Sequence, residues 1–466
     1  MGKSKISVGL VNSTYSNGWI GSVESDGTME AVAVNEIISG TAMTTDPRVI
    51  PISTTGTLRT LINSYAYGGV GGLGQQGSAL YGIYNPTGSG TPSTWGSPIE
   101  KAQSNQSSPV TGVQEWSVSN PYTAAVLGNT MYLSDNDNVS SDLSARIYSY
   151  DMTGDAFTQN ELATAPFYKF VPGNDPSSNP YKGAGTGLEL YNDGTDDYLI
   201  ATFNRYNNTG WTYNFGPSEL VKIKISDGSN ESVSLNHNSS GVVVEGDFAY
   251  VTSVGGAQVT NGNPLSKLEM VDISLSPDVL PNALDVTKSN SVLSGFSGGD
   301  YIDVAFVGTK AYVLLAHYYD EDPKTYVGYK YAIIQTTAND LQNGGFGIAP
   351  KFITGTTNPA SPTFALLPSG LGELYFVDGV NIKLIDTSVD IDQTTPTNAI
   401  SLVKTAGDFE NYNESPSVDG YVLNTAGVVI EKTPTAMALK AGAKRASVTK
   451  MAKRLARPED LERDKK

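Results

Sequence analysis

The chain contains no cysteine and only two histidines, His237 and His317, among its 466 residues. Thiolate zinc sites, iron–sulfur clusters, covalently attached haem and cysteine nucleophiles are therefore excluded. A Ser-His-Asp triad would have to use one of those two histidines. No stretch of the sequence approaches the ~20 apolar residues of a membrane span. These shortages remove several enzyme classes and predict no membrane-spanning segment.

The net charge of −17 is distributed unevenly along the chain. Residues 432–466 hold 11 Lys and Arg against 4 Asp and Glu, which gives +7 and leaves −24 on the remainder. An acidic body repels phosphate backbones, so we expect no nucleic-acid partner. The N-terminus, MGKSKISVGL, lacks the apolar run of a signal peptide. The low lysine content and abundant Ser, Thr, Asn and Tyr favour an exported bacterial protein, extracellular or periplasmic if a signal peptide was removed.

A glycine followed four residues later by a tyrosine recurs along the sequence. Looser copies bring in Tyr375 and Tyr421, and the tyrosines follow one another at intervals of 46 to 66 residues. The repeats are Gly77–Tyr81, Gly128–Tyr132, Gly194–Tyr198, Gly246–Tyr250 and Gly308–Tyr312. Units of this length that hold several short strands are typical of propeller blades. We expect the glycine to allow a tight hairpin turn, and the tyrosine to pack between blades with its hydroxyl bonded at the edge.

Each unit reads as four short strands. Around Tyr250 these are SGVVVEG, DFAYVTSVGG, SKLEMVDISLSP and NALDVTKS. Strands of the form G-x-x-x-Y-V and D-x-S resemble those of the seven-bladed β-propeller superfamily of bacterial exported proteins. The resemblance implies an all-β fold of four-stranded antiparallel blades over residues 1–431. The strand at 5–13 is expected to close the ring by joining the last blade, and GWIGSVES with MEAVAVNEI leave an eighth blade as an alternative.

Residues 432–466 form a separate basic tail in this interpretation. Val448, Met451, Ala452 and Leu455 recur at helical spacing, which predicts a partly helical segment. Two interpretations of the tail stay open. It is either a solvated extension, or it makes an electrostatic contact with an acidic surface.

The long insertions fall mostly between the second and third strands of a unit, so they extend one face of the ring. Loops longer than about 12 residues usually carry a function or are disordered. Two of them are rich in aromatic residues, which either bind a ligand or cover one another. The candidate ligand-binding residues are Phe203, Tyr206, Trp211, Tyr213 and Phe215 in one loop, and His317, Tyr318, Tyr319, Asp320 and Tyr326 in the other.

One further loop, SDNDNVSSD, holds Asp135, Asp137 and Asp142 among Asn and Ser oxygens. Such hard oxygen ligands suit Ca²⁺, but the glycine of a calcium loop is missing, so a solvated acidic turn is the other interpretation. No other cofactor is expected. The sequence favours a non-catalytic binding or scaffold protein that recognises a glycan, peptide or protein at the cell surface or in the periplasm. The alternative is a hydrolase or lyase that acts on a polysaccharide or lactone at the central channel.

Overall fold

The computed structural model places a large part of the chain in β-strands. It describes residues 4–11, 18–33, 61–63, 72–76, 79–83, 97–98, 115–116, 121–127, 130–135, 143–151, 165–209, 212–255, 266–274, 280–286, 300–319, 328–347, 350–357, 363–368, 372–378, 381–396, 399–405, 408, 422–430 and 453–454. The architecture is all-β, as the repeat pattern predicts. One short helix, α2 (Ala338–Gln342), interrupts the strands.

Five sheets are built from consecutive strands, and in each the strand order follows the sequence. The first contains β9 (Pro121–Leu127), β10 (Thr130–Asp135), β11 (Ala145–Asp151) and β12 (Tyr168–Phe170). The second contains β13 (Lys182–Asn192), β14 (Asp197–Thr209), β16 (Pro217–Lys224) and β17 (Asn230–His237), with β15 (Thr212–Phe215) paired to β14. The third contains β18 (Ser239–Glu245), β19 (Phe248–Ser253), β20 (Lys267–Asp272) and β21 (Leu284–Asp285).

The remaining sheets complete this set. The fourth contains β22 (Asp300–Val307), β23 (Lys310–Tyr319), β24 (Gly328–Thr337) and β25 (Lys351–Thr357). The fifth contains β26 (Thr363–Pro368), β27 (Leu374–Asp378), β28 (Asn381–Ile385) and β29 (Ile400–Thr405). Two short strands, β7 (Ser97–Pro98) and β8 (Glu115–Trp116), pair with each other, and β4 (Leu61–Asn63), β5 (Gly72–Gln76) and β6 (Ala79–Ile83) form a small group of their own.

A sixth four-stranded sheet joins the two ends of the sequence. Its order is β30 (Val422–Ile430), β1 (Ser4–Val11), β2 (Gly18–Glu24) and β3 (Met29–Ala33), and β1 runs antiparallel to β30. The sequence predicted that the single strand at 5–13 joins the last blade; instead three N-terminal strands join one C-terminal strand. The stretches GWIGSVES and MEAVAVNEI therefore supply β2 and β3 of this sheet, and the alternative that they begin an eighth blade is wrong for these strands.

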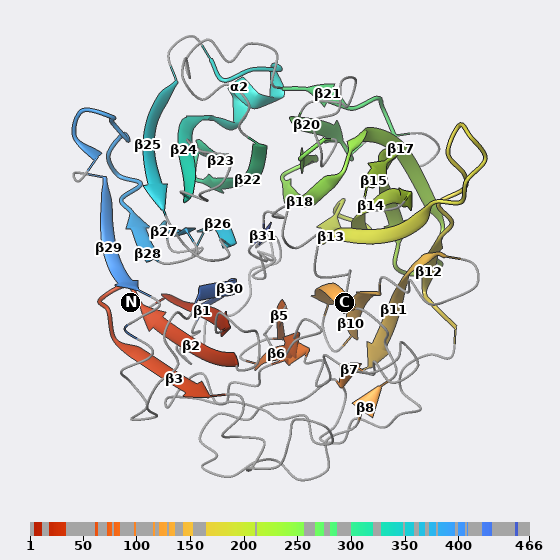
Figure 1. Cartoon of the computed structure of the whole chain (residues 1–466), viewed down its shortest axis with the longest axis horizontal. Coiled ribbons are helices and arrows are strands. Elements are labelled where there is room, and N and C mark those ends of the chain that lie inside the picture. Colours follow the sequence, from red (N-terminus) through yellow and green to blue (C-terminus); the bar gives the residue numbers. More distant parts are fainter. Residues whose placement is uncertain are drawn as a thin grey trace.

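The sheets stand around a ring when the molecule is viewed down its shortest axis (Figure 1). The innermost strands contact one another in the cyclic order β5, β9, β13, β18, β22, β26, β30 and back to β5. Buried apolar clusters fill the spaces between successive sheets, from the β9–β12 sheet to the β26–β29 sheet. The core is thus divided into layers between neighbouring sheets, and each sheet needs a neighbour on both faces.

Among the described residues, the repeated glycine and tyrosine do most of what their spacing predicts. Gly246 and Gly308 have φ values of 61°, at the turns between the first and second strands. Tyr198 and Tyr312 lie in the clusters that fill two different spaces between sheets. The Tyr198 hydroxyl donates to Asp193 at 3.1 Å, but the buried Tyr312 hydroxyl has no hydrogen-bond partner among the described residues. An edge partner for every hydroxyl is therefore a wrong expectation, because the Tyr312 side chain ends inside the core.

The D-x-S signature also has a physical basis. The carboxylates of Asp227, Asp272 and Asp386 each accept from the backbone N–H and the hydroxyl of the serine two residues later, at 2.6 to 3.0 Å. These bonds turn the chain after the third strand of a sheet. In the β22–β25 sheet the signature is missing, and α2 begins there instead, with Thr337 as its N-cap.

Part of the basic tail is described, and it is extended. Lys453 and Arg454 form β31, which pairs antiparallel with the start of β26. The prediction of a helix is therefore wrong for these two residues.

Candidate functional site

The connections between the second and third strands lie at one end of the ring, which we call the rim. The most extended of those described belongs to the β13–β17 sheet. There β14 runs to Thr209, and β15 folds back along it from Thr212 before β16 begins. The segment that reads as a loop at 203–218 is therefore mostly a β-hairpin. A hairpin held by backbone hydrogen bonds presents its side chains with more order than a loop does.

The predicted aromatic residues of this hairpin occupy different environments. Phe203 is 1% exposed and stacks on Phe170, with ring centroids 4.7 Å apart, so its side chain belongs to the core. Tyr206 and Phe215 are half-buried and face each other across the hairpin, with centroids 6.1 Å apart. Tyr213 lies on β15 opposite Asn208. Trp211 falls outside the described residues.

The second predicted group begins as a strand. His317, Tyr318 and Tyr319 end β23, where their backbones pair with the first residues of β24. The expected loop at 317–329 is shorter than the sequence suggested, because β23 continues to Tyr319 and β24 starts at Gly328. Asp320 and Tyr326 fall outside the described residues.

The predicted calcium loop is described at one position. Asp135 is the last residue of β10, and its backbone pairs with Arg146 of β11. Asp137 and Asp142 fall outside the described residues. Within the part of the chain that the structure describes, no group of three or more His, Asp or Glu side chains could hold a metal ion.

Arg205 fixes the base of the rim hairpin. Its Nε donates to the Pro172 carbonyl at 3.0 Å, and its Nη1 donates to the Pro217 carbonyl at 2.8 Å. The guanidinium also pairs with the Glu219 carboxylate and lies 4.9 Å from the centre of the Phe170 ring. A planar guanidinium suits such a multidentate role. Arg205 thereby holds the connection before β13 against the hairpin.

A compact turn lies beside this base. The Asp175 carboxylate accepts from the backbone and side chain of Asn179, from the Ser177 N–H, and from the Asn207 side chain on β14, at 2.7 to 2.9 Å. The Asn179 bonds, followed by the others, lower the pKa of this carboxyl, so it stays ionised at neutral pH. Tyr181 also contacts the hairpin: its ring fills the space where a side chain at Gly216 would lie. The segment 171–181 and the hairpin therefore form one surface.

The inner strands share an irregularity at the rim end. The registers of β9, β13, β18, β22 and β30 shift by one residue near their starts, which places one extra residue on the inner strand. In β13 and β18 the extra residues are Thr186 and Ser240. The Thr186 hydroxyl lies 3.1 Å from that of Thr202, and the Ser240 hydroxyl lies 2.8 Å from that of Thr252. Such bulges are common beside functional sites, where they redirect the chain.

Side chains of one sheet hold the bulge of the next. The amide of Asn204 donates to the Ser239 carbonyl at 3.0 Å and its oxygen accepts from Ser218 and Ser239. One sheet further on, the Thr252 hydroxyl donates to the Ile302 carbonyl at 3.1 Å. Asn204 is buried, so these bonds are shielded from water and rigidify the rim.

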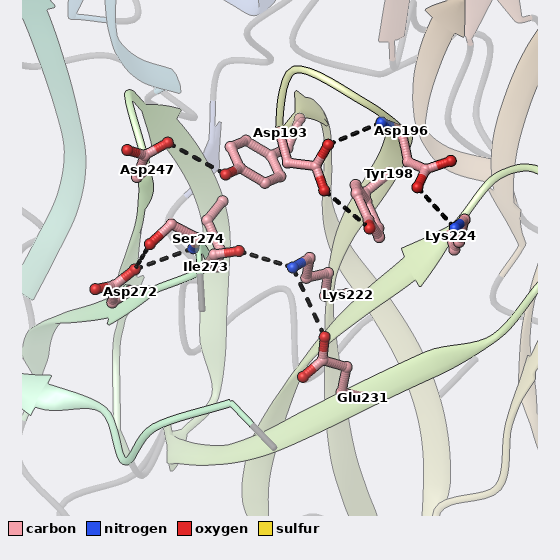
Figure 2. Close-up of polar contacts among 11 residues, drawn as sticks. Asp193, Asp196, Tyr198, Lys222, Lys224, Glu231, Asp247, Asp272, Ile273 and Ser274 are labelled. Atoms are coloured by element: carbon pink, nitrogen blue, oxygen red, sulfur yellow. Dashed lines mark hydrogen bonds and ion pairs between the residues drawn. The ribbon is translucent and has the colours of Figure 1, made fainter. Parts of the chain in front are cut away.

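A different polar cluster lies at the opposite end of the ring, between the β13–β17 and β18–β21 sheets (Figure 2). Lys222 is 3% exposed and donates to the Ile273 carbonyl at 2.8 Å, with Glu231 at 3.7 Å. Its ammonium lies 4.5 Å from the centre of the Tyr198 ring. The Tyr191 hydroxyl crosses between the same sheets to Asp247 at 3.2 Å. Because Lys222 is enclosed, the cluster joins two sheets rather than receiving a ligand.

Asp300 was not singled out in the sequence. It is the first residue of β22 and is half-buried at the rim end, opposite Ala316 and next to the strand position of His317. Burial raises the pKa of its carboxyl to about 7. The sequence signal that precedes it is GFSGG at 295–299, whose Ser297 sits in a G-x-S-x-G pattern outside the described residues.

No known protein-family model matches the chain, and no curated protein matches it either. The extracellular domain of a putative one-component system from B. thetaiotaomicron is similar in structure with a TM-score of 0.26 and 12% identity, over 86% of this chain and 46% of that one. The present chain thus spans less than half of that structure. A hypothetical selenium-binding protein from Sulfolobus tokodaii is similar in structure with a TM-score of 0.28 and 9% identity, over 77% of this chain and 93% of that one. Both TM-scores are too low to define a shared fold or to transfer a function.

No helix within the described ranges is long and apolar enough to cross a bilayer.

Proposed function

We propose that the chain is a single seven-bladed β-propeller over residues 1–431. Six four-stranded sheets supply six blades, and β4, β5 and β6 belong to the seventh. The main support is the cyclic order of contacts among seven inner strands, in which β5 lies between β30 and β9. Closure through β1 and β30 joins the chain ends within one blade, a common way to tie a ring of repeats.

We further propose that the protein binds a glycan, peptide or protein at the rim without catalysing a reaction, outside the cell or in the periplasm. The observation that carries this proposal is the rim hairpin, which projects beyond its sheet and offers the partly exposed rings of Tyr206 and Phe215. Arg205 and Asp175 hold its base in one geometry. Aromatic side chains on a rigid support are typical of recognition surfaces, because little side-chain entropy is lost on binding.

The test is a thermal-shift screen of the full chain against a glycan library, a peptide library and divalent cations including Ca²⁺. A ligand of the folded state raises the melting temperature. Tyr206→Ala and Phe215→Ala should reduce that rise at a fixed ligand concentration by weakening binding at least tenfold. Thr195→Ala, in an exposed turn at the opposite end, is the control and should leave the rise unchanged. A ligand whose effect is the same in all four proteins would place binding elsewhere and contradict the proposal.

A second candidate function is a hydrolase or lyase acting at the channel mouth. It is favoured by one observation, the Asp300 carboxyl with its pKa near 7, which suits general acid–base chemistry. His317 follows the residue that pairs with Asp300, and Ser297 precedes it in the sequence. Turnover of polysaccharide or lactone substrates that disappears in Asp300→Asn and Ser297→Ala would favour this function over pure binding.

A further inference from the structure

The inner edge of β26 is unlike the inner edges around it. Five of the six four-stranded sheets begin their inner strand with a bulge, whereas β26 pairs with β27 in unbroken register from Phe364 to Pro368. Bulges twist a strand edge and discourage the addition of another strand. Within the residues that the structure describes, β26 is therefore the one inner strand of these six whose edge is regular at the rim end.

That regular edge carries two different partners. The N–H of Leu366 points away from β27 and donates to the buried carboxylate of Asp303 on β22, at 2.9 Å. Two and three residues earlier, Phe364 and Thr363 pair with Lys453 and Arg454 of β31. Because alternate residues of a strand turn their N–H groups to the same side, the N–H of Phe364 faces β31. The tail thus uses the part of the edge that Asp303 leaves open.

The position and charge of the tail agree with this pairing. Figure 1 places β31 inside the ring, beside β26. The tail carries +7 and the remaining residues carry −24, so attraction brings the tail back to the body. Such attraction has little direction, whereas backbone pairing fixes the register.

We propose that residues 453–454 of the C-terminal tail are a built-in occupant of the rim end of the ring, added as an extra strand to the inner edge of β26 of the same chain. A ligand that enters at the rim end must pass or displace it. The proposal does not depend on the identity of that ligand, or on the binding function proposed above.

The absence of cysteine allows a direct test in the full-length protein. Residues paired across an antiparallel ladder have Cα atoms about 4.5–5.5 Å apart, within the range for a disulfide. Thr363→Cys combined with Arg454→Cys should therefore cross-link within one chain under mild oxidation, at least tenfold faster than Thr363→Cys combined with Lys466→Cys. Equal rates would overturn the proposal, and so would disulfide-linked dimers, which would assign the tail to a second copy.

Hydrogen exchange provides a second test that needs no cysteine. Removal of residues 432–466 should speed exchange of the Phe364 amide at least tenfold and leave the Leu366 amide, held by Asp303, unchanged. Lys453→Pro should act like the deletion because proline cannot donate to a ladder, whereas Lys453→Gln should keep the protection. Unchanged Phe364 exchange after deletion would show that the tail does not occupy this edge. Equal loss in the Gln and Pro variants would show that charge, not strand pairing, holds it.

Discussion

Replacing Tyr312 by Phe removes one oxygen atom from the core and is expected to stabilise the protein. Tyr312 is fully buried in the space between the β22–β25 and β26–β29 sheets, and its hydroxyl has no hydrogen-bond partner among the described residues. Burying an unbonded hydroxyl costs about 1–3 kcal/mol. Removing this cost stabilises the folded state, but the small void that the oxygen leaves offsets part of the gain. We expect a net gain of about 0.5–1.5 kcal/mol in the free energy of unfolding.

Tyr198→Phe is the matched control, because it deletes the same atom at the equivalent repeat position. The Tyr198 hydroxyl donates to the Asp193 carboxylate at 3.1 Å. A hydrogen bond to a charged group contributes about 1.5–3 kcal/mol, and this one lies near the end of the sheet, so we expect a loss of about 1–2 kcal/mol. The two substitutions should therefore change stability in opposite directions. Urea unfolding of the three proteins at pH 7 measures both changes.

Alkaline pH adds an independent measurement on the same variant. Burial, with smaller contributions from Asp390 and Asp386, raises the pKa of Tyr312 to about 12, against about 10 in an unfolded chain. The unfolded state then loses its proton first, so the folded protein loses stability as the pH rises from about 10 to about 12. The Tyr312→Phe variant should lose less stability than the wild type between pH of about 10 and about 12. If Tyr312→Phe destabilises by more than about 1 kcal/mol at pH 7 and keeps the alkaline loss, the hydroxyl has a partner and the reasoning fails.

Three further substitutions test other parts of the structure. Gly187→Ala should lower the free energy of unfolding by about 2–3 kcal/mol, because its new methyl group would lie 2.6 Å from the Val242 backbone nitrogen. Gly345→Ala, whose methyl group would have no atom within 4 Å, is the control and should change it by no more than about 0.5 kcal/mol. Urea unfolding measures both. Lys222→Met should lower stability by about 3–5 kcal/mol, because it removes a buried ammonium that lies 3.7 Å from the Glu231 carboxylate and donates to the Ile273 carbonyl. The raised pKa of Asp300 means that its ionised form is disfavoured in the folded state, so the wild type should lose stability as the pH rises from about 4 to about 7. Asp300→Asn should remove this loss, which the melting temperature measures across that pH range.

Much of the sheet architecture could be predicted from the sequence because its signals are local. A glycine at a positive φ and an Asp two residues before a Ser each act within a few residues, and Gly246 and Asp272 behave as expected. The alternation of apolar residues between those turns then fixes each four-stranded unit. How many strands each end of the chain contributes to the terminal sheet was less predictable. Residues 422–430 form one strand, although its NTAG segment has the composition of a turn, and only pairing with β1 shows that the strand is continuous.

The candidate site was harder to predict, because its features depend on contacts between sheets. Aromatic composition drew attention to Phe203 and Tyr206 equally, yet the first packs on Phe170 from the preceding sheet and the second stays partly exposed. Arg205, which lies between them in the sequence, gives no periodic signal, although it holds the hairpin to Pro172. A one-dimensional pattern records which side chains alternate, but not which neighbouring sheet covers them.

The rim bulges show how such hidden features limit function. An extra residue at the start of an inner strand is invisible in the sequence, because Thr186 and Ser240 look like ordinary strand positions. Its effect is to make the edge of the innermost strand irregular, and polar bonds from the preceding sheet hold the bulge in place. Inner strands with such blunted edges resist added strands, while β26 has the one regular start among the described parts of these sheets. If that start were bulged like the others, the tail would lose its backbone partner and retain only its charge. The first residues of β26 therefore decide, together with residues 453–454, whether the tail pairs at this edge.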